Sequence, residues 1–206
     1  MELLIHPTYF PSISHFVAML QAEQLVFETD DNFQKQTNRN RMYIYSANGT
    51  QLLNIPVKHS KEIHQKYKDV KIEQAFDWQK QHFKSLEAAY RTSPYFEYFE
   101  DDIVPIFEKK QTFLLDMNFQ IHEILCDCLG IELSYTKTTE YFKNPTQTDL
   151  RSLANGKKDL NVFTPYTQVF DDKHGYINNL SILDLLFNEG RHAVQYLKEQ
   201  KLILPE

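Results

Sequence analysis

The segment formed by residues 34–41 has the composition of a ligand-binding loop. Its eight residues include three cations and four side-chain amides, and it follows an acidic pair, Asp30 and Asp31. Core packing requires none of these groups, whereas an anionic or polyhydroxylated ligand is bound through such side chains. A solvated loop is the alternative interpretation. We favour a ligand clamp, and the substrate-binding residues predicted in this segment are Gln34, Lys35, Arg39, Asn40 and Arg41.

Two other side chains are candidates for catalysis, His82 and Asp30. His82 shares a predicted helix face with Trp78 and Leu86, so it is either a satisfied core residue or a general base with a pKa suited to neutral pH. Asp30 follows a predicted strand without opening a helix. It could orient an amine or a hydroxyl group of a ligand, or it could be part of a loop turn.

Composition indicates a soluble globular protein. The 206 residues carry a net charge of −6, which argues against binding to a nucleic acid duplex, and no apolar run is long enough to span a membrane. The first residues do not resemble a signal peptide, so we expect a cytoplasmic location. Charge is nevertheless uneven, because between Phe33 and Lys68 one acid, Glu62, stands against seven cations. These cations are Lys35, Arg39, Arg41, Lys58, Lys61, Lys66 and Lys68.

The N-terminal part of the sequence reads as a strand–helix–strand unit. Residues 3–6 and 25–28 are predicted strands, and Ser12 can cap a helix between them. Tyr9 and Asp30 follow the two strands, at the edge where open α/β sheets bind ligands. Residues 41–45 and 52–57 flank Asn48 and Gly49, a strong hairpin signal. Residues 70–72 alternate like a further short strand.

From residue 77 onward the pattern becomes mainly helical. Predicted helices start at Asp77, at Pro94 and near residue 113, and the third ends before Gly130. Residues 131–135 and 162–170 are predicted strands around a polar stretch, and further helices cover 181–188 and 191–200. Ser181 and Asp184 have capping-box spacing. We therefore expect one α/β domain, 1–206, with a Rossmann-like open mixed sheet, an inserted hairpin (within 1–76) and a largely helical C-terminal half (77–206).

The sequence contains no motif for several common types of cofactor, catalytic or metal site. Five glycines form no dinucleotide or phosphate-binding fingerprint, and no nucleophile elbow occurs. Cys126 and Cys128 point in different directions on a helix, and the histidines show no metal-ligand spacing. We thus expect neither a metal site nor an evident cofactor. The stretch from His6 to His15 faintly resembles the His-containing turn of nucleotidyltransferases, although Ser14 replaces the usual glycine.

Blocks distributed along the chain resemble the WbqC-like family of bacterial proteins. The N-terminal blocks are residues 7–11, 34–41, 48–49 and 55–57, and the central ones contain Trp78, His82 and residues 94–96. The C-terminal blocks contain Tyr166, Gln168 and residues 179–190. His6 is a departure, because many members have glutamine there. The resemblance implies an association with genes for surface polysaccharides such as O-antigen, and a glycine-like aminoacyl transferase role.

We therefore expect a transferase that moves an aminoacyl or acyl group to a nucleotide- or lipid-linked sugar. Its partner would be this small-molecule ligand, while the oligomeric state stays open. Arg39 and Arg41 would hold phosphate, Asn40 and Gln34 would bind hydroxyls, and His82 would be the base. The substrate-binding set also includes Tyr9, Tyr166 and Gln168. The alternatives are a non-catalytic nucleotide-sugar or phosphosugar binding protein, and a nucleotidyltransferase acting at the His6 to His15 turn.

Overall fold

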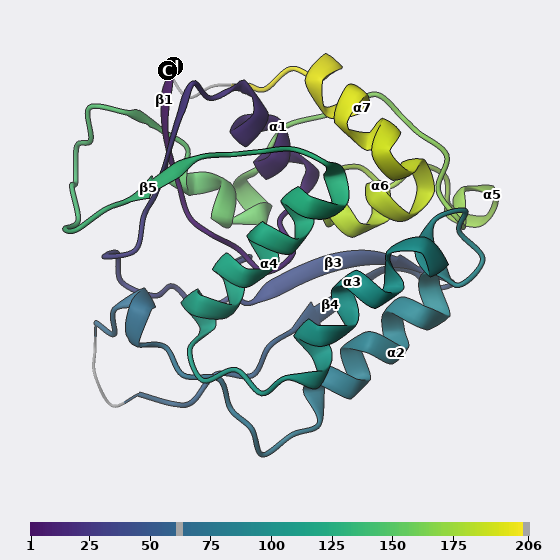
Figure 1. Ribbon diagram of the computed structural model, residues 1–206, viewed down its shortest axis with the longest axis horizontal. Coiled ribbons are helices and arrows are strands. Elements are labelled where there is room, and N and C mark those ends of the chain that lie inside the picture. The colour runs from purple at the N-terminus through teal and green to yellow at the C-terminus, as the bar shows by residue number, and fades with distance from the viewer. Residues whose placement is uncertain (61–63, 204–206) are drawn as a thin grey trace.

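The main sheet has four parallel strands. The computed structural model describes residues 1–60 and 64–203 of the chain, and Figure 1 shows their arrangement. The sheet order is β5-β2-β1-β6, with every pairing parallel. The strands are β1 (Glu2–Ile5), β2 (Gln24–Phe27), β5 (Tyr135–Lys137) and β6 (Thr148–Asp149).

The hairpin forms a sheet of its own. Strand β3 (Arg41–Ser46) pairs antiparallel with β4 (Gly49–Asn54). Its connection is Ala47–Asn48, since Ser46 pairs with Gly49, and only Gly49 adopts a positive φ, 91°. The turn therefore needs left-handed backbone at one residue, where the Asn-Gly signal predicted two. The strand ends before Pro56, which cannot donate a ladder hydrogen bond.

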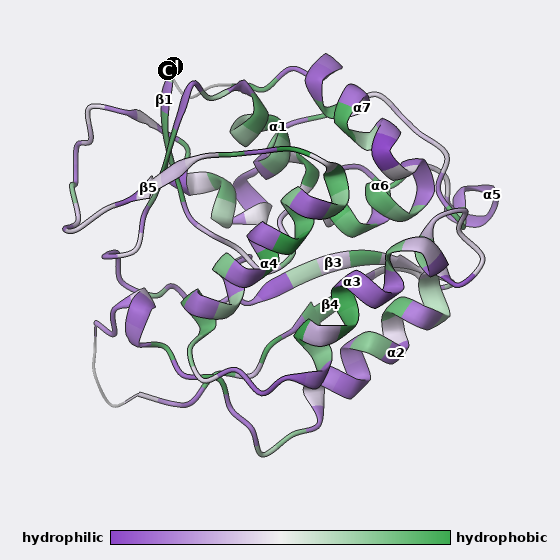
Figure 2. Ribbon diagram, viewed as in Figure 1, coloured by the Kyte–Doolittle hydropathy of each residue, from purple (hydrophilic) through white to green (hydrophobic). Residues whose placement is uncertain are grey.

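Six of the seven α-helices in the described part of the chain lie after residue 77 (Figure 1). Helix α4 ends at Gly130, whose φ of 67° is the left-handed conformation expected at a helix C-terminus. Figure 2 shows apolar and polar stretches alternating along α2 and α4, as expected for helices with one buried face. The helices are α1 (Ile13–Gln21), α2 (Trp78–Tyr90), α3 (Phe96–Glu108), α4 (Leu114–Leu129), α5 (Asp171–His174), α6 (Ile182–Glu189) and α7 (Ala193–Glu199).

The expected α/β class, the hairpin and the helical C-terminal half are all confirmed. Buried side chains from the sheet, the hairpin and the helices form one continuous hydrophobic cluster. Three local predictions differ from the structure. Residues 162–170 form no strand, residues 70–72 make only isolated bridges, and the strand predicted at 131–135 lies at Tyr135–Lys137. None of the described helices is long and apolar enough to cross a membrane.

The strand order creates a switch point beside β1. The chain leaves β1 through α1 and returns as β2 on one side, whereas β6 pairs with the opposite side of β1. The loops that leave the carboxyl ends of β1 and β6 therefore diverge, and in open α/β sheets ligands bind in the crevice between such loops. His6 follows β1, and Arg151 follows β6 by two residues.

Candidate functional site

A cavity of about 730 Å³ opens at this switch point, and we call it the carboxyl-edge cavity. Its walls come from the loops after β1, β2 and β6 and from two more distant segments of the chain. His6 and Gln34 are among its lining residues. Its charged lining side chains are Asp31, Arg39, Lys143, Asp149, Arg151 and Lys158. A cavity of this size at this edge of a parallel sheet is where a small-molecule site is expected.

Arg39 forms the floor of the cavity and is 2% exposed. Its Nη2 donates to His6 Nε2 at 2.7 Å and to Asp31 Oδ2 at 3.0 Å. Burial lowers the pKa of Arg39. Because a guanidinium can only donate, His6 Nε2 must accept, and the His6 proton sits on Nδ1, which donates to the Arg151 carbonyl at 3.3 Å.

His6 is held in its neutral form by this arrangement. Burial, and then the neighbouring Arg39 charge, lowers its pKa. Although burial alone would raise the pKa of Asp31, its contacts with His6 and Arg39 lower it, so Asp31 is a carboxylate at neutral pH. His6 Nε2 lies 3.0 Å from Asp31 Oδ2. Arg39 Nη2 donates to both of these atoms and therefore bridges the imidazole and the carboxylate.

The second arginine of the cavity is also paired with carboxylates. Arg151 Nε and Nη2 donate to the two oxygens of Asp149 at 2.9 and 2.7 Å, and Nη1 donates to buried Glu28 at 3.1 Å. The Asp149 contact raises the pKa of Arg151. The lysines differ, because Lys143 and Lys158 are exposed and form no ion pair with any described residue. The free positive charge of the cavity is thus carried by lysines.

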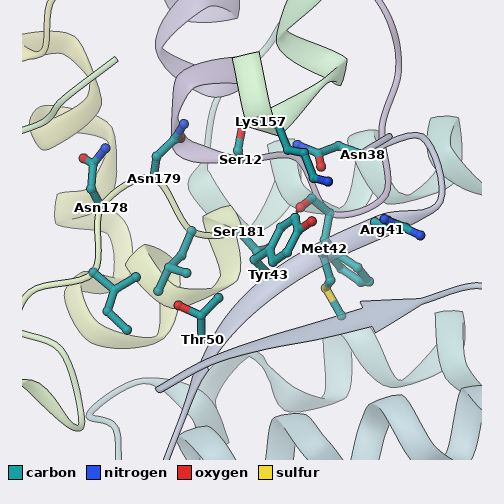
Figure 3. A pocket seen from close by; sticks show the side chains of 14 residues that line it. Ser12, Asn38, Arg41, Met42, Tyr43, Thr50, Lys157, Asn178, Asn179 and Ser181 are labelled. Carbon is teal, nitrogen blue, oxygen red and sulfur yellow. The ribbon is translucent and has the colours of Figure 1, made fainter. Parts of the chain in front are cut away.

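A second, smaller cavity of about 300 Å³ lies against the hairpin, and we call it the hairpin cavity (Figure 3). It is lined by both polar and apolar side chains, and no carboxylate is among the described residues that line it. The lining residues used below are Phe10, Asn38, Arg41, Met42, Tyr43 and Lys157. The two cavities share two walls, residues 34–41 and 151–158, since Asn38 N donates to the Ala154 carbonyl at 2.7 Å.

The predicted ligand clamp is therefore divided between two cavities. Gln34 and Arg39 line the carboxyl-edge cavity, and Arg41 lines the hairpin cavity. Lys35 lies at a separate small hollow. Asn40 lines neither cavity, because its Nδ2 donates to Asn54 Oδ1 and the Ile55 carbonyl, tying the segment to the hairpin. Of the other residues in the basic stretch, Lys61 and Glu62 lie outside the described residues.

The expectation that Asp30 and His82 would share a cleft with Arg39 is not met. Asp30 Oδ1 accepts from Lys68 at 2.6 Å, away from both cavities. His82 is 5% exposed, lines neither cavity and accepts from the Tyr9 hydroxyl at 2.9 Å. Burial lowers the pKa of His82 to about 4, against a smaller opposing effect of the Asn54 backbone. Asp30 therefore forms an ion pair with Lys68, His82 forms a buried hydrogen bond, and Tyr9 likewise faces the interior.

Tyr166 and Gln168 contact a buried carboxylate. Tyr166 Oη and Gln168 Nε2 donate to Asp184 Oδ2 at 2.5 and 2.9 Å, and Tyr90 Oη donates to Oδ1 at 2.8 Å. Burial raises the pKa of Asp184, although these three donors oppose it. Asp184 thus organises a polar network of three donors. Helix α6 is capped by the Ser181 side chain, which accepts from Leu183 N. Neither Tyr166 nor Gln168 lines either of the two cavities.

Sequence reasoning missed most of the carboxyl-edge cavity. Asp149, Arg151, Lys143 and Lys158 lie in the polar stretch predicted to be loop, and β6 has only two residues, too few for a period-two pattern. The signal that could have found them is the Asp-Leu-Arg sequence at 149–151. In it a buried leucine separates two residues of opposite charge. The sequence marks Asp31 only as the second member of an acidic pair with Asp30, with no role of its own.

Comparison with known proteins identifies the family of the chain. The model of the WbqC-like protein family matches residues 6–162. The chain belongs to the WbqC-like protein family. Every residue that lines the carboxyl-edge cavity falls in this range, whereas residues 177–181 of the hairpin cavity lie beyond it. The "Uncharacterized protein Rv1507c" of Mycobacterium tuberculosis is 27% identical over 226 residues, covering 95% of this chain and 96% of that protein. No solved structure matches.

Proposed function

We propose that this WbqC-like protein is an aminoacyl or acyl transferase that acts on a nucleotide- or lipid-linked sugar bound in the carboxyl-edge cavity. The observation that carries the proposal is the combination of carboxylates with Lys143 and Lys158, which form no ion pair with a described residue, at the switch point of a parallel sheet. The family resemblance supports a role in surface polysaccharide synthesis, and a nucleotide-linked acceptor would place the reaction in the cytoplasm.

Each part of such a ligand has a partner in the cavity. Lys143 and Lys158 suit phosphate oxygens, which lysine binds as a point charge. Asp31 and Asp149 can accept from sugar hydroxyl or amino groups. Tyr141, which lines the cavity, is 45% exposed, and the Arg151 guanidinium lies 4.9 Å from its ring centroid. Its ring therefore offers a stacking surface for a sugar or a base.

The transfer step needs a proton acceptor but no covalent enzyme intermediate. The amino group of the sugar attacks the carbonyl carbon of an activated acyl donor, such as a thioester. The new carbon–nitrogen bond forms, the carbon–sulfur bond breaks, and the thiolate leaves. The Asp31 carboxylate takes up the proton that the amine loses, because the Nε2 lone pair of buried His6 already accepts from Arg39 Nη2. Asp31 replaces His82 in this role because it lines the cavity.

The proposal is tested with an amino sugar linked to UDP and an acyl thioester. Mass spectrometry of the nucleotide sugar should show the mass of one added acyl group, and Asp31→Asn should slow its formation by about 100-fold, the lower end of the range for acid–base groups. If the nucleotide sugar binds with no acyl transfer to it from thioester or acyl phosphate donors, the non-catalytic binding protein is the better account. Consumption of ATP or CTP with release of pyrophosphate would instead favour nucleotidyl transfer.

A further inference from the structure

We propose that the hairpin cavity is a second binding site, which takes a small organic anion with a carboxylate or phosphate head and a short apolar body. The site is separate from the carboxyl-edge cavity and does not depend on what binds there. Its volume, about 300 Å³, suits a ligand of amino-acid size.

The charge of this cavity is positive and unbalanced. Arg41 Nε donates to Asn54 Oδ1 at 3.2 Å, and the two terminal nitrogens of Arg41 have no partner among the described residues. Lys157 is exposed and likewise forms no ion pair with a described residue. Both arginines of the carboxyl-edge cavity are, by contrast, held by carboxylates. An anion entering the hairpin cavity would therefore meet an unoccupied guanidinium fork and an ammonium group.

A buried polar side chain lines the same space without a partner. Asn38 is 7% exposed, and its amide forms no hydrogen bond with any described residue. The Asn38 amide atoms are not among the fully enclosed unpaired atoms of the described chain, so water or a ligand in the cavity can supply their hydrogen bonds. The hydroxyl of half-buried Tyr43 is also without a partner in the described part of the chain. Figure 3 shows that Asn38, Tyr43 and Lys157 reach the cavity from different segments.

Apolar side chains also line the cavity. They include Phe10, Met42 and Leu180, which are 1%, 2% and 2% exposed. The polar groups and the apolar surface together select a ligand with one charged end and one apolar end. Neighbouring polar side chains are already used internally. Asn179 accepts from Ser14 N at 2.9 Å and donates to Asp159 at 2.7 Å, so it supports the wall and is not free for the ligand.

Fluorine NMR tests the site with 4-fluorobenzoate and 4-fluorophenyl phosphate as probes and uncharged 4-fluorobenzamide as the control ligand. At least one anionic probe should bind with low-millimolar or better affinity, and the amide should bind far more weakly. Lys157→Gln should weaken anion binding roughly tenfold, as expected for loss of one charge-assisted contact. Arg41→Lys keeps the charge but removes the fork, so its effect should be smaller than that of Arg41→Gln.

Lys158→Gln is the matched control, because Lys158 is the next residue and lines the other cavity. It should leave probe binding unchanged. The proposal is overturned if neither anion binds, if the amide binds equally well, or if Lys158→Gln weakens binding as much as Lys157→Gln. A failure of acyl transfer in the carboxyl-edge cavity would leave all of these expected results unchanged.

Discussion

Lys157 and Lys158 are consecutive residues that line different cavities. Both belong to the 3-10 turn Gly156–Lys158, in which successive side chains point about 120° apart because the turn has three residues per revolution. One short turn therefore supplies a cation to the hairpin cavity and another to the carboxyl-edge cavity. Lys157→Gln would therefore remove a positive charge from the hairpin cavity, and Lys158→Gln would remove one from the carboxyl-edge cavity.

Gly156→Ala should disturb the wall between the two cavities. A Cβ at Gly156 would lie 3.2 Å from Asn38 Nδ2, closer than ordinary van der Waals contact. The Asn38 backbone cannot move away freely, since its N–H and its carbonyl both form backbone hydrogen bonds. We expect a loss of about 1 kcal/mol in unfolding free energy, measured by urea denaturation. Asn38→Ser should relieve the contact, so full additivity of the two substitutions in a double-mutant cycle would contradict this explanation.

His82→Leu should affect stability more than ligand binding. The substitution leaves the buried Tyr9 hydroxyl without its acceptor, which we expect to cost about 1–3 kcal/mol in thermal or urea unfolding. Tyr9→Phe in the His82→Leu background should recover part of this loss, because it removes the unpaired hydroxyl. Nucleotide-sugar affinity should stay within about twofold of the unmodified protein. A stable His82→Leu protein that has lost acyl transfer would restore His82 as the catalytic base.

Tyr166→Phe should destabilise the fold through Asp184. The carboxylate would keep Gln168 and Tyr90 as donors but lose the Tyr166 hydroxyl, with an expected cost of about 1–3 kcal/mol. Tyr176→Phe is a suitable control, because Tyr176 packs against the Tyr166 ring but does not contact Asp184. Unfolding of both variants should be compared at pH 7. Weakened sugar binding by Tyr166→Phe without loss of stability would instead support its predicted role in substrate binding.

Stability should fall as the pH is lowered from about 6.5 to about 4. Burial lowers the pKa of His15, His82 and His122 to about 4 each. In this pH window the unfolded chain binds protons that the folded chain does not, so the stability present above the ordinary histidine pKa is lost on acidification. Each histidine contributes roughly 3 kcal/mol over the whole window.

His122→Leu isolates one of these contributions. His122 lies outside both cavities and packs edge-on against Phe27 and Tyr135. Urea unfolding at several pH values should give a flatter dependence for the variant, by roughly 3 kcal/mol over the window. Other titrating groups, including Asp184, act equally in both proteins and cancel in the comparison. Equal slopes for the two proteins would show that His122 is not held neutral by burial.

Local sequence signals were sufficient for the elements with long or well-capped patterns. The apolar spacing of α1, the Asn-Gly turn and Gly130 at the end of α4 placed these elements within a few residues. The same reasoning failed for β6, because a two-residue strand is stabilised by its pairing with β1 and has no pattern of its own. The strand predicted at residues 162–170 is wrong for the opposite reason. Phe163, Tyr166 and Val169 pack against the core as irregular chain, whereas Val162 is exposed.

Segment 34–41 shows that local sequence signals are also insufficient to predict the candidate site. Its composition correctly marked unusual polar chemistry, but a list of residues cannot show which side chains are already paired. Arg39 is buried against Asp31 and His6, while Arg41 keeps free nitrogens. That difference depends on the approach of His6, 33 positions before Arg39, and on the position of Arg41 in the hairpin. The distant lysines 143 and 158 reach the cavity only because β6 pairs with β1.

The most direct test of the central claim is calorimetric titration of a UDP-linked amino sugar into the unmodified protein, Lys158→Gln, Lys157→Gln and Lys80→Gln. Lys80 is exposed on α2 and lines neither cavity. The carboxyl-edge cavity predicts roughly tenfold weaker binding for Lys158→Gln, with Lys157→Gln and Lys80→Gln close to the unmodified protein. Absence of binding to the unmodified protein, or equal affinity for Lys158→Gln and Lys80→Gln, would contradict the claim.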